Sequence, residues 1–283
     1  MNLKERLHSH LIQIVRDRNP YLASAGHFYV QQYIREQLAE WGTVEINDFA
    51  VRGRIHHNFI LDLPPSEKAS QQGLSPIIIG AHYDTVPGTP GADDNATGVA
   101  VLLELARELA SQPLKYPVQL VAFDMEESGY FGSTHHAAKY KQQKQSIRLM
   151  ISLEMLGYCD RTPNSQSYPA RLKYFYPNCG DFIALIGNLR TVGDMMNLSR
   201  NIRKSGQACE WLPVPNRGLI VPDTRRSDHV PFWDNGYPAI MVTDTANMRN
   251  PHYHQASDKI ETLDLDFLAG VCRGLIEAIR YIM

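Results

Sequence analysis

The sequence predicts an α/β protein with a mostly parallel sheet that helices cover on both faces. Short apolar runs such as Ile77–Ile79 and Val118–Phe123 alternate with segments of helical period such as 95–110. This alternation is typical of parallel sheets, because strands that are buried on both faces are continuously apolar. With 283 residues, 43% of them hydrophobic, the chain is long enough to bury a sizeable core without disulfides.

The elements follow from the periodicity of apolar residues. Two helices are expected at 3–17 and 25–41, then extended stretches around 43–51 and 58–63, and a polar surface loop at 66–73. Next come strand 77–79, helix 95–110, strand 118–123, helix 132–144 and strand 149–153. An apolar run at 182–188, a helix at about 193–204, a strand at 239–242 and a helix at 263–281 complete the chain. We interpret 1–283 as one domain with loop insertions near 157–179 and 207–226.

Composition and charge argue against several classes of partner. The net charge of −2 favours neither nucleic acid nor an anionic membrane surface. No run approaches the ~20 apolar residues that span a bilayer. The charged, amphipathic stretch 1–11 does not resemble a signal peptide, so we expect a cytoplasmic protein. The four cysteines include no C-x-x-C pair, which favours free thiols over a cysteine-zinc site.

Polar residues follow the predicted strands, at the edge of the sheet where ligands bind in folds of this kind. His82 and Asp84 come directly after the apolar run 77–80. A neutral imidazole is the commonest metal ligand, and a carboxylate two residues on can hold its other nitrogen. Taken alone, a His-x-Asp after a strand is more often a loop hydrogen bond.

A second cluster, Asp93-Asp94-Asn95, stands at the start of the helix predicted at 95–110. Asp and Asn are favoured helix N-caps, and for Asp93 and Asn95 capping competes evenly with a functional role. For Asp94 the sequence indicates something more specific. Two cations in one site repel each other unless an anion lies between them, and the two oxygens of a carboxylate can each bind one metal. Asp94 is therefore the candidate bridging ligand.

Glu126 and Glu127 follow the strand at 118–123. Adjacent carboxylates repel, so a Glu-Glu pair normally lies in a solvated loop. Here the pair is held between an apolar strand and the stretch G-Y-F-G at 129–132. In extended backbone the two side chains would point to opposite sides. One could then bind a metal while the other acts as a general base.

Glu154 and two later clusters complete the set of candidates. Glu154 ends a predicted buried strand, where its charge needs either a metal or an ion pair with an Arg or Lys. His252 and His254 stand two residues apart, and either could be a ligand. The roles of Asp228 and His229 are open.

Taken together, these stretches resemble metallopeptidase family 28, the co-catalytic zinc aminopeptidases that also include glutamate carboxypeptidase and glutaminyl cyclase. Six pieces match in the family's order, over most of the chain from about residue 24. They are A-H-Y-D-T (81–85), G-A-D-D-N-A-T-G (91–98), F-D-M-E-E-S-G-Y-F-G-S (123–133), S-L-E-M-L-G (152–157), S-D-H-V-P-F (227–232) and Y-H-Q-A-S-D (253–258). Each piece is weak alone, but six in order are a specific signal.

The resemblance implies a three-layer α/β/α sandwich around a central mixed, mostly parallel sheet, with a site for two Zn²⁺ ions or for one. It places His82, Asp94 and Glu154 on one zinc ion. It places Asp94, Glu127 and His254 on the other. The family usually has Asp where this chain has Glu154, whose longer side chain can still reach a metal.

The resemblance also implies an activity, an aminopeptidase that hydrolyses N-terminal peptide bonds of a peptide or aminoacyl substrate. Glu126 matches the family's general base. Asp84 matches the carboxylate that orients the first histidine. Tyr253 stands where some members place a tyrosine that steadies the tetrahedral intermediate.

Two other interpretations stay open. A glutaminyl cyclase of the same fold binds one functional zinc through counterparts of Asp94, Glu127 and His254, but the cyclases carry a tryptophan where this chain has Tyr253. A catalytically inactive, peptide-binding relative is the second alternative. A third group, the His-x-Asp amidohydrolases, is suggested by H-Y-D-T-V-P (82–87) but lacks the D-D-N-A-T-G pattern of the bridging segment.

The two loop insertions are expected to wall the substrate pocket. Aromatic side chains that could line it are Tyr158, Tyr168, Tyr174, Phe175, Tyr176 and Trp211. Packing within the loops explains them at least as well. Arg225 and Arg226 could pair with a substrate carboxylate, although solvated surface charge is the simpler interpretation.

Overall fold

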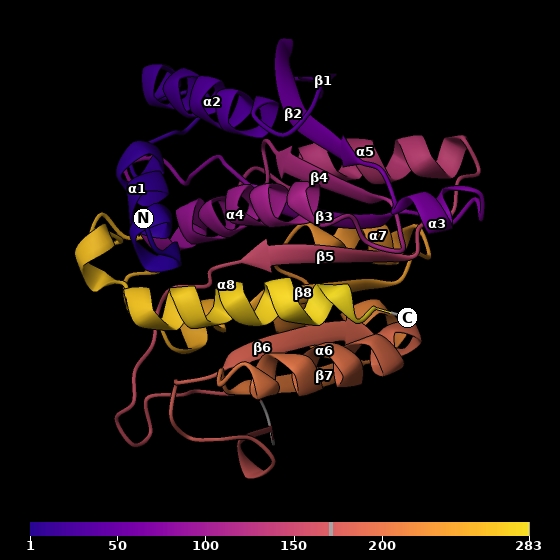
Figure 1. The fold of residues 1–283 in the computed structure, drawn as a ribbon. Helices are drawn as coiled ribbons and strands as arrows, with labels where there is room; N and C mark the ends of the chain where they lie inside the picture. The colour runs from indigo at the N-terminus through magenta and orange to yellow at the C-terminus, as the bar shows by residue number, and fades with distance from the viewer. Residues whose placement is uncertain (170–171, 283) are drawn as a thin grey trace.

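The computed structural model describes residues 1–169 and 172–282. Eight strands form one sheet in the order β1-β2-β4-β3-β5-β8-β6-β7, with helices packed on both faces (Figure 1). The strands are β1 (Val44–Val51), β2 (Arg54–Leu63), β3 (Ile77–His82), β4 (Val118–Phe123), β5 (Leu149–Glu154), β6 (Ile183–Asn188), β7 (Cys209–Val214) and β8 (Ala239–Thr243).

Parallel pairing forms the centre of the sheet. β4 pairs with β3, β3 with β5, and β5 with β8, all in parallel. Antiparallel pairs flank this centre, because β2 joins β1 to β4 on one side and β6 pairs with β8 on the other. The edge strand β7 is again parallel, to β6. The predicted mixed, mostly parallel sheet is confirmed.

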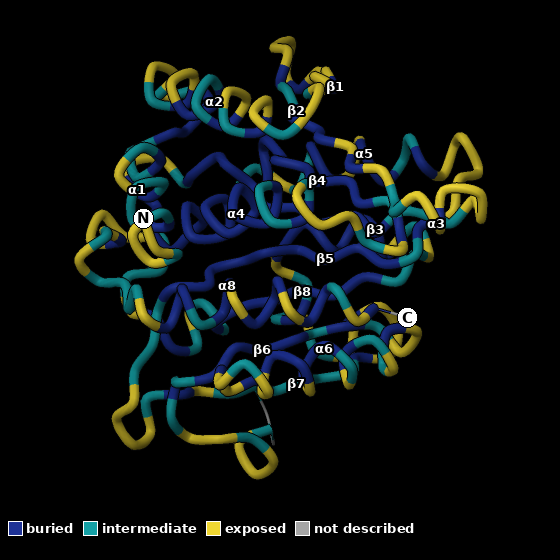
Figure 2. Tube along the Cα trace, in the orientation of Figure 1, coloured by how far each residue is buried: buried dark blue, intermediate teal, exposed yellow. Residues whose placement is uncertain are grey.

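Two hydrophobic cores lie on opposite faces of this sheet. Successive strand side chains alternate between faces, so Ile77 and Ile79 enter the larger core while Ile78 enters the smaller one. The larger core includes α1 (Leu3–Ile14), α2 (Ser24–Ala39), α4 (Gly98–Ser111), α6 (Val192–Lys204) and α8 (Leu265–Arg280). The smaller core includes α5 (Phe131–Gln142) and α7 (His229–Asp234). The three-layer sandwich is thereby confirmed, and Figure 2 shows its buried central layer.

Three segments differ from the prediction. Residues 207–226 are not all loop, because Cys209–Val214 forms β7; this strand is mostly half-buried and contains a proline, so it lacks the apolar run of a buried strand. The polar segment 66–73 contains a one-turn helix, α3 (Glu67–Ser70). Residues His229–Asp234, for which no element was predicted, form helix α7; its Pro231 lies in the first turn, where backbone N–H groups have no helical partner.

None of the helices in the described part of the chain is both long and apolar enough to cross a membrane. All four cysteines are free thiols. Cys209 and Cys272 are buried, and Cys159 and Cys179 are half-buried.

Candidate metal centre

The predicted site residues meet at one edge of the sheet. His82 is the last residue of β3, and Glu154 is the last residue of β5. Glu126 and Glu127 follow β4, which lies next to β3. His254 comes from the connection between β8 and α8. Because the carboxyl ends of neighbouring parallel strands lie side by side, residues far apart in the sequence converge here.

Asp94 lies between the two histidines, with one carboxylate oxygen facing each. Its Oδ1 is 3.3 Å from His82 Nε2. Its Oδ2 is 3.1 Å from His254 Nε2. A bridging ligand needs this arrangement, because each oxygen can then serve a different cation.

The His254 side of the site contains the three residues that the sequence grouped together. Glu127 Oε2 is 3.3 Å from His254 Nε2. Ligand atoms of Asp94, Glu127 and His254 all lie within 4.8 Å of one another. This group is partly open, since the His254 side chain is 35% exposed.

The His82 side is fully buried. Glu154 Oε2 is 3.6 Å and Glu126 Oε2 is 3.9 Å from His82 Nε2. Ligand atoms of His82, Glu126 and Glu154 form a second group within 4.8 Å. The sequence grouped Asp94, rather than Glu126, with His82 and Glu154. The distances place both carboxylates beside this histidine.

Glu126 and Glu127 do not lie in extended backbone, which corrects the prediction. They belong to a turn in which the residue before them, Met125, has φ +61°. Their carboxylates nevertheless separate, that of Glu126 toward His82 and that of Glu127 toward His254. The turn therefore separates the two carboxylates, as the predicted extended backbone would have done.

Asp84 holds this turn against the end of β3. Its Oδ1 accepts a hydrogen bond from Glu126 N (3.0 Å), and its Oδ2 accepts one from Glu127 N (3.2 Å). Asp84 Oδ1 also lies 3.4 Å from His82 Nδ1. The carboxylate thus contacts both halves of the site, which is more than the predicted contact with one histidine.

Asp94 lies in an irregular turn, Ala92–Thr97, so α4 begins at Gly98 rather than at 95 as predicted. The peptide bond between Asp94 and Asn95 is cis. Asp258 holds this turn, because its two carboxylate oxygens accept hydrogen bonds from Asp93 N (2.9 Å) and Asp94 N (3.1 Å).

Asp93 and Asn95 connect this turn to the segment after β5. Asn95 Oδ1 accepts hydrogen bonds from Gly98 N, at the start of α4, and from Met155 N, both at 3.1 Å. Asp93 Oδ1 accepts from Gly157 N at 2.9 Å. Asn95 therefore combines contact with the helix start with a tertiary contact.

Glu154 contacts a histidine and a serine rather than an Arg or Lys. Ser227 Oγ donates to Glu154 Oε2 at 2.6 Å, and Ser152 Oγ lies 2.9 Å from Ser227 Oγ. Ser227 comes from the motif S-D-H-V-P-F, whose residues had no predicted role. A hydroxyl next to a carboxylate is a common way to orient a metal ligand.

Burial and mutual repulsion favour the protonated forms of the three glutamates in the site. Burial raises the pKa of Glu127 to about 7, and the charge of Asp94 adds to this effect. Burial also raises the pKa of Glu126, opposed by His82 and reinforced by Glu127 and Glu154. The pKa of Glu154 is raised by burial as well. Such shifts cluster at functional sites, where they reflect charge that the protein alone does not balance.

The pKa values of the two histidines are raised as well, which favours their charged forms. Burial works against the charged form of His254, but Asp94 and Glu127 raise its pKa to about 10. Burial likewise opposes the charge on His82, yet Glu126, Asp84 and the other neighbouring carboxylates raise its pKa. The site thus binds protons where a cation would fit.

The chemistry of these side chains suits zinc. Within the described residues neither ring nitrogen of His82 has a hydrogen-bond partner, although the ring is 1% exposed. Carboxylate oxygens lie 3.3–3.9 Å from these nitrogens, but a buried imidazole that makes no hydrogen bond costs free energy unless a ligand compensates it. Imidazole nitrogens and carboxylate oxygens are typical zinc ligands. The two groups are therefore candidate metal-binding sites, and the Asp94 carboxylate has one oxygen beside a histidine of each group.

Comparison with known proteins assigns the family. Residues 58–279 match the profile of "Peptidase family M28". The chain belongs to peptidase family M28. It is 38% identical over 262 residues to YfbL of Escherichia coli, an uncharacterized protein, with 87% of this chain and 77% of that protein covered. It is 41% identical over 213 residues to aminopeptidase YwaD of Bacillus subtilis, with 72% and 41% covered.

Two solved structures show the shared fold. LapA aminopeptidase of Legionella pneumophila has a TM-score of 0.72 at 16% identity, covering 98% of this chain and 71% of that chain. The glutaminyl cyclase of Porphyromonas gingivalis has a TM-score of 0.70 at 20% identity, covering 99% of both chains. This M28 chain spans less than half of the length of YwaD.

The other predicted residues lie around the M28 centre. Tyr253 stacks on His254, with ring centroids 3.7 Å apart. His252 points elsewhere, because its Nδ1 lies 2.9 Å from Ser257 Oγ. Asp228 is fully buried, and within the described residues neither of its carboxylate oxygens has a hydrogen-bond partner. His229 Nε2 lies 2.8 Å from Thr224 O, away from the metal-binding groups.

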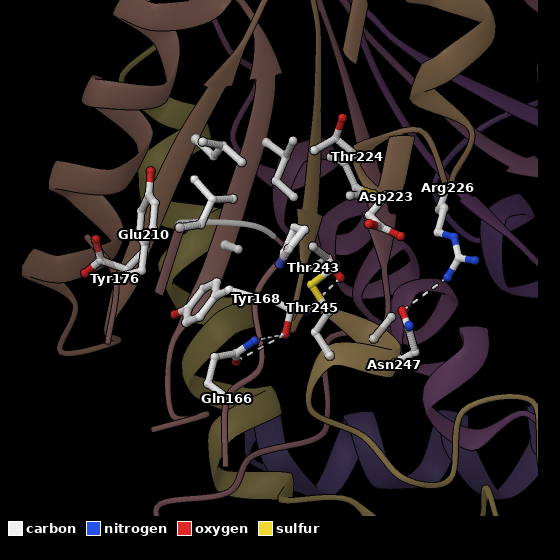
Figure 3. Close-up of a pocket in the computed structure, with 18 of the residues that line it drawn as sticks. Gln166, Tyr168, Tyr176, Glu210, Asp223, Thr224, Arg226, Thr243, Thr245 and Asn247 are labelled. Atoms are coloured by element: carbon white, nitrogen blue, oxygen red, sulfur yellow. Dashed lines mark hydrogen bonds between the residues drawn. The ribbon is translucent and has the colours of Figure 1, made fainter. Parts of the chain in front are cut away.

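A mostly apolar pocket adjoins this centre (Figure 3). Glu154 and Tyr253 line it, which places it directly beside both groups of metal-binding atoms. The apolar lining comes from β6, β7, β8 and their flanking segments, through Phe182, Ala184, Ile186, Leu212, Met241 and Met248. Both predicted insertions contribute to its walls.

The aromatic residues of the insertions divide into two sets. Tyr168, Tyr176 and Trp211 line the pocket. Tyr174 and Phe175 are instead exposed, and Tyr158 packs against the ring of His252. Of the two arginines, Arg226 lines the pocket and donates to Asn247, whereas Arg225 pairs with Asp234.

Sequence reasoning missed the residues that hold the ligands. Asp258 and Ser227 both lay inside matched motifs, so their presence there was the available signal. Ser152 begins the matched motif S-L-E-M-L-G and had the same signal, but a serine inside an apolar strand is usually only a small core residue.

Proposed function

We propose that this M28 protein is a zinc-dependent aminopeptidase that hydrolyses the N-terminal peptide bond of a peptide, with Glu126 as general base. One observation carries the proposal: the two oxygens of Asp94 face His82 and His254 at 3.3 and 3.1 Å. A single carboxylate that faces two histidines in this way suits a pair of metal ions.

The proposed ligands follow these distances. His82, Asp94 and Glu154 would hold one zinc ion, and Asp94, Glu127 and His254 the other. When bound, zinc lowers the pKa of water and polarises a carbonyl group. Ser227 fixes the Glu154 carboxylate for this task, and Asp258 fixes the backbone of Asp94.

Glu126 is the proposed general base. Its carboxylate is buried beside the site, 3.9 Å from His82 Nε2, and Asp84 fixes its backbone N–H. Its pKa is raised by burial and by neighbouring carboxylates, which suits a group that accepts a proton from water and returns it to the leaving amine. Asp84 is the proposed orienting carboxylate for His82 and for the turn that carries Glu126.

Tyr253 and the adjoining pocket would bind the substrate. Burial raises the pKa of Tyr253, so its hydroxyl stays a hydrogen-bond donor that can steady an oxyanion. The apolar pocket beside Glu154 and Tyr253 suits an apolar side chain on the first residue of the substrate. The similarity to aminopeptidase YwaD supports this assignment.

A glutaminyl cyclase activity is the second candidate. The likeness of fold to the Porphyromonas gingivalis cyclase, over 99% of both chains, favours it. The complete group of Asp94, Glu127 and His254 would supply the one metal site that it needs. Tyr253, where cyclases carry a tryptophan, argues for the peptidase.

The test combines metal content with a substrate panel. The purified protein is loaded with zinc, its zinc content is measured, and the loaded and chelated forms are assayed on aminoacyl amides and on N-terminal glutaminyl peptides. We expect two equivalents of zinc and release of apolar aminoacyl groups. One equivalent with ring closure of glutamine would establish the cyclase. Absence of zinc and of both activities would overturn the proposal and favour a catalytically inactive, peptide-binding relative.

A further inference from the structure

Arg18 is a buried cation at the edge of the metal centre. It lies in the chain between α1 and α2, outside the 58–279 region that matches the family profile. Its side chain is 0% exposed. Burying a guanidinium is costly unless all of its donors are used. The groups around Arg18 must therefore compensate this cost.

The guanidinium donates to carbonyl oxygens in three segments of the chain. Nε donates to Tyr83 O at 2.7 Å, between His82 and Asp84. On the loop that leads to Asp94, Nη1 donates to Pro90 O (2.7 Å), and Nη2 to Gly91 O (2.8 Å) and Asp94 O (3.4 Å). Within its own segment, Nη1 donates to Arg16 O (3.2 Å) and Ile14 O (3.5 Å).

These contacts join the two pieces of backbone that carry opposing ligands. One piece is the end of β3, which carries His82. The other is the turn with Asp94, whose Oδ1 lies 3.3 Å from His82 Nε2. Neighbouring groups strengthen the same connection: Arg18 N donates to Thr85 Oγ1 (3.0 Å) and Asn19 Nδ2 to Thr85 O (3.1 Å).

The loop around Gly91 is shaped to fit the guanidinium. Gly91 has φ +59°, and a Cβ there would lie 3.0 Å from Arg18 Nη1 and 2.3 Å from Asp94 O. Only glycine lets the loop approach this closely. The loop, the guanidinium and Asp94 therefore pack as one unit.

The charge of Arg18 also matters to the site. Burial lowers the pKa of the guanidinium to about 10, while Asp94, Asp258, Asp84 and Glu127 act against this shift. Arg18 therefore stays protonated at neutral pH. Within the described residues it forms no ion pair with a carboxylate. Its positive charge consequently acts on the acidic cluster as a whole and leaves the carboxylates free for metal.

We propose that Arg18 is a positioning residue of the metal centre, which fixes the spacing of His82 and Asp94 through their backbones. This inference rests on the proposed zinc site. It adds the N-terminal segment, which the family profile does not cover, to the residues that build that site. A lysine cannot replace it, because only the planar fork of Arg reaches all these carbonyls at once.

The test measures zinc affinity by competition with a chromophoric chelator, in the full chain and in three variants. Arg18→Lys keeps the charge without the fork, and Arg18→Met removes both. Arg6→Met is the matched control, because Arg6 also connects the N-terminal segment to the body of the protein, pairing with Glu104 at 2.8 Å, but does not contact the site. Thermal unfolding of each metal-free form and the visible absorption of the Co²⁺ form are recorded in parallel.

We expect Arg18→Lys and Arg18→Met to bind zinc about 10- to 100-fold more weakly, the range for residues that orient ligands. Their Co²⁺ spectra should change as well. Arg6→Met should unfold at a lower temperature and keep the zinc affinity and the spectrum of the parent. If the Arg18 variants unfold more easily but bind zinc as the parent does, Arg18 is only structural and the inference is wrong.

Two other outcomes are possible: the Arg18 variants do not fold, or the parent chain binds no zinc. If neither Arg18 variant folds, Thr85→Val removes the hydroxyl that accepts the hydrogen bond from Arg18 N at 3.0 Å; weaker zinc binding then supports the inference and unchanged binding overturns it. If the parent chain itself binds no zinc, the proposed function fails first, which distinguishes that failure from a failure of the role of Arg18.

Discussion

His82 and His254 lie on opposite sides of Asp94, but the protein places them in different ways. His82 ends a strand whose six residues are all buried, and its ring is 1% exposed. His254 lies in a loop, with φ +56° and a side chain that is 35% exposed. Strand pairing fixes the first histidine, whereas local loop structure and the stacked ring of Tyr253 fix the second.

Because of this difference, the site has a buried half and an open half. The buried half, with Glu126 and Glu154, supplies a fixed arrangement of charge that solvent does not screen. The open half, with Glu127 and His254, is where substrate can arrive. The apolar pocket reaches Tyr253 at the open half and Glu154 at the buried one. A substrate in that pocket would therefore contact both halves.

The largest expected effect comes from Glu126→Gln. Turnover should fall by about 10²- to 10⁴-fold, the usual contribution of a general acid–base group. Zinc content should not change, because the proposed ligands are intact. Zinc content and kcat of the same preparation check this. Loss of one zinc equivalent would instead make Glu126 a ligand, as its place beside His82 and Glu154 permits.

Exchanging each histidine for alanine should separate the two halves. His82→Ala should lose about 3–5 kcal/mol of unfolding free energy in the metal-free form, since it leaves buried carboxylates without a partner. His254→Ala should lose clearly less, because the His254 side chain is 35% exposed and water can take its place beside Asp94 and Glu127. Each variant should lose one zinc equivalent. Urea unfolding and zinc content give the comparison, and equal losses of stability would contradict it.

His252→Ala is the matched control for His254→Ala. The two histidines are two residues apart, but His252 contacts Ser257 rather than the acidic cluster. The variant should keep both zinc equivalents and its activity.

Zinc affinity should rise with pH between about pH 6 and pH 9, because metal must displace protons from its ligands. The pKa values of His254, about 10, and of Glu127, about 7, are both raised. The metal-free folded state thus binds more protons than the unfolded chain, and its stability falls as pH rises through those values. The unfolding temperature should be higher with zinc than without it, and this difference should increase with pH. A difference that does not depend on pH would contradict the prediction.

The smallest effect is expected for Ser227→Ala. The variant loses the 2.6 Å hydrogen bond to Glu154 and should weaken zinc binding by about 10-fold. Ser257→Ala, which loses the contact to His252, serves as the control and should bind zinc as the parent does. Zinc competition titrations of both variants decide this.

Most of the fold could be predicted from the sequence, because buried strands and amphipathic helices have distinct apolar patterns. β7 could not, since its residues Cys209–Val214 are half-buried at an edge and include a proline. Helix α7 was missed because it has only six residues and contains Pro231.

Some residues of the site could be predicted from the sequence and others could not. His82, Asp94, Glu127, Glu154 and His254 could be predicted, because they stand at strand ends or in matched motifs, and the structure brings them together. The supports of the site could not. Arg18 makes its contacts to backbone carbonyls, which any sequence offers, so no pattern marks it. The turn at Glu126 escaped prediction because its backbone depends on Asp84, which follows another strand, β3.

Anomalous diffraction at the zinc edge, from crystals of the zinc-loaded protein, tests the central claim most directly. The two-metal site predicts two anomalous peaks, one on each side of the Asp94 carboxylate, the first next to His82 and the second next to His254. A single peak, or peaks that leave Asp94 without contact to metal, would contradict it.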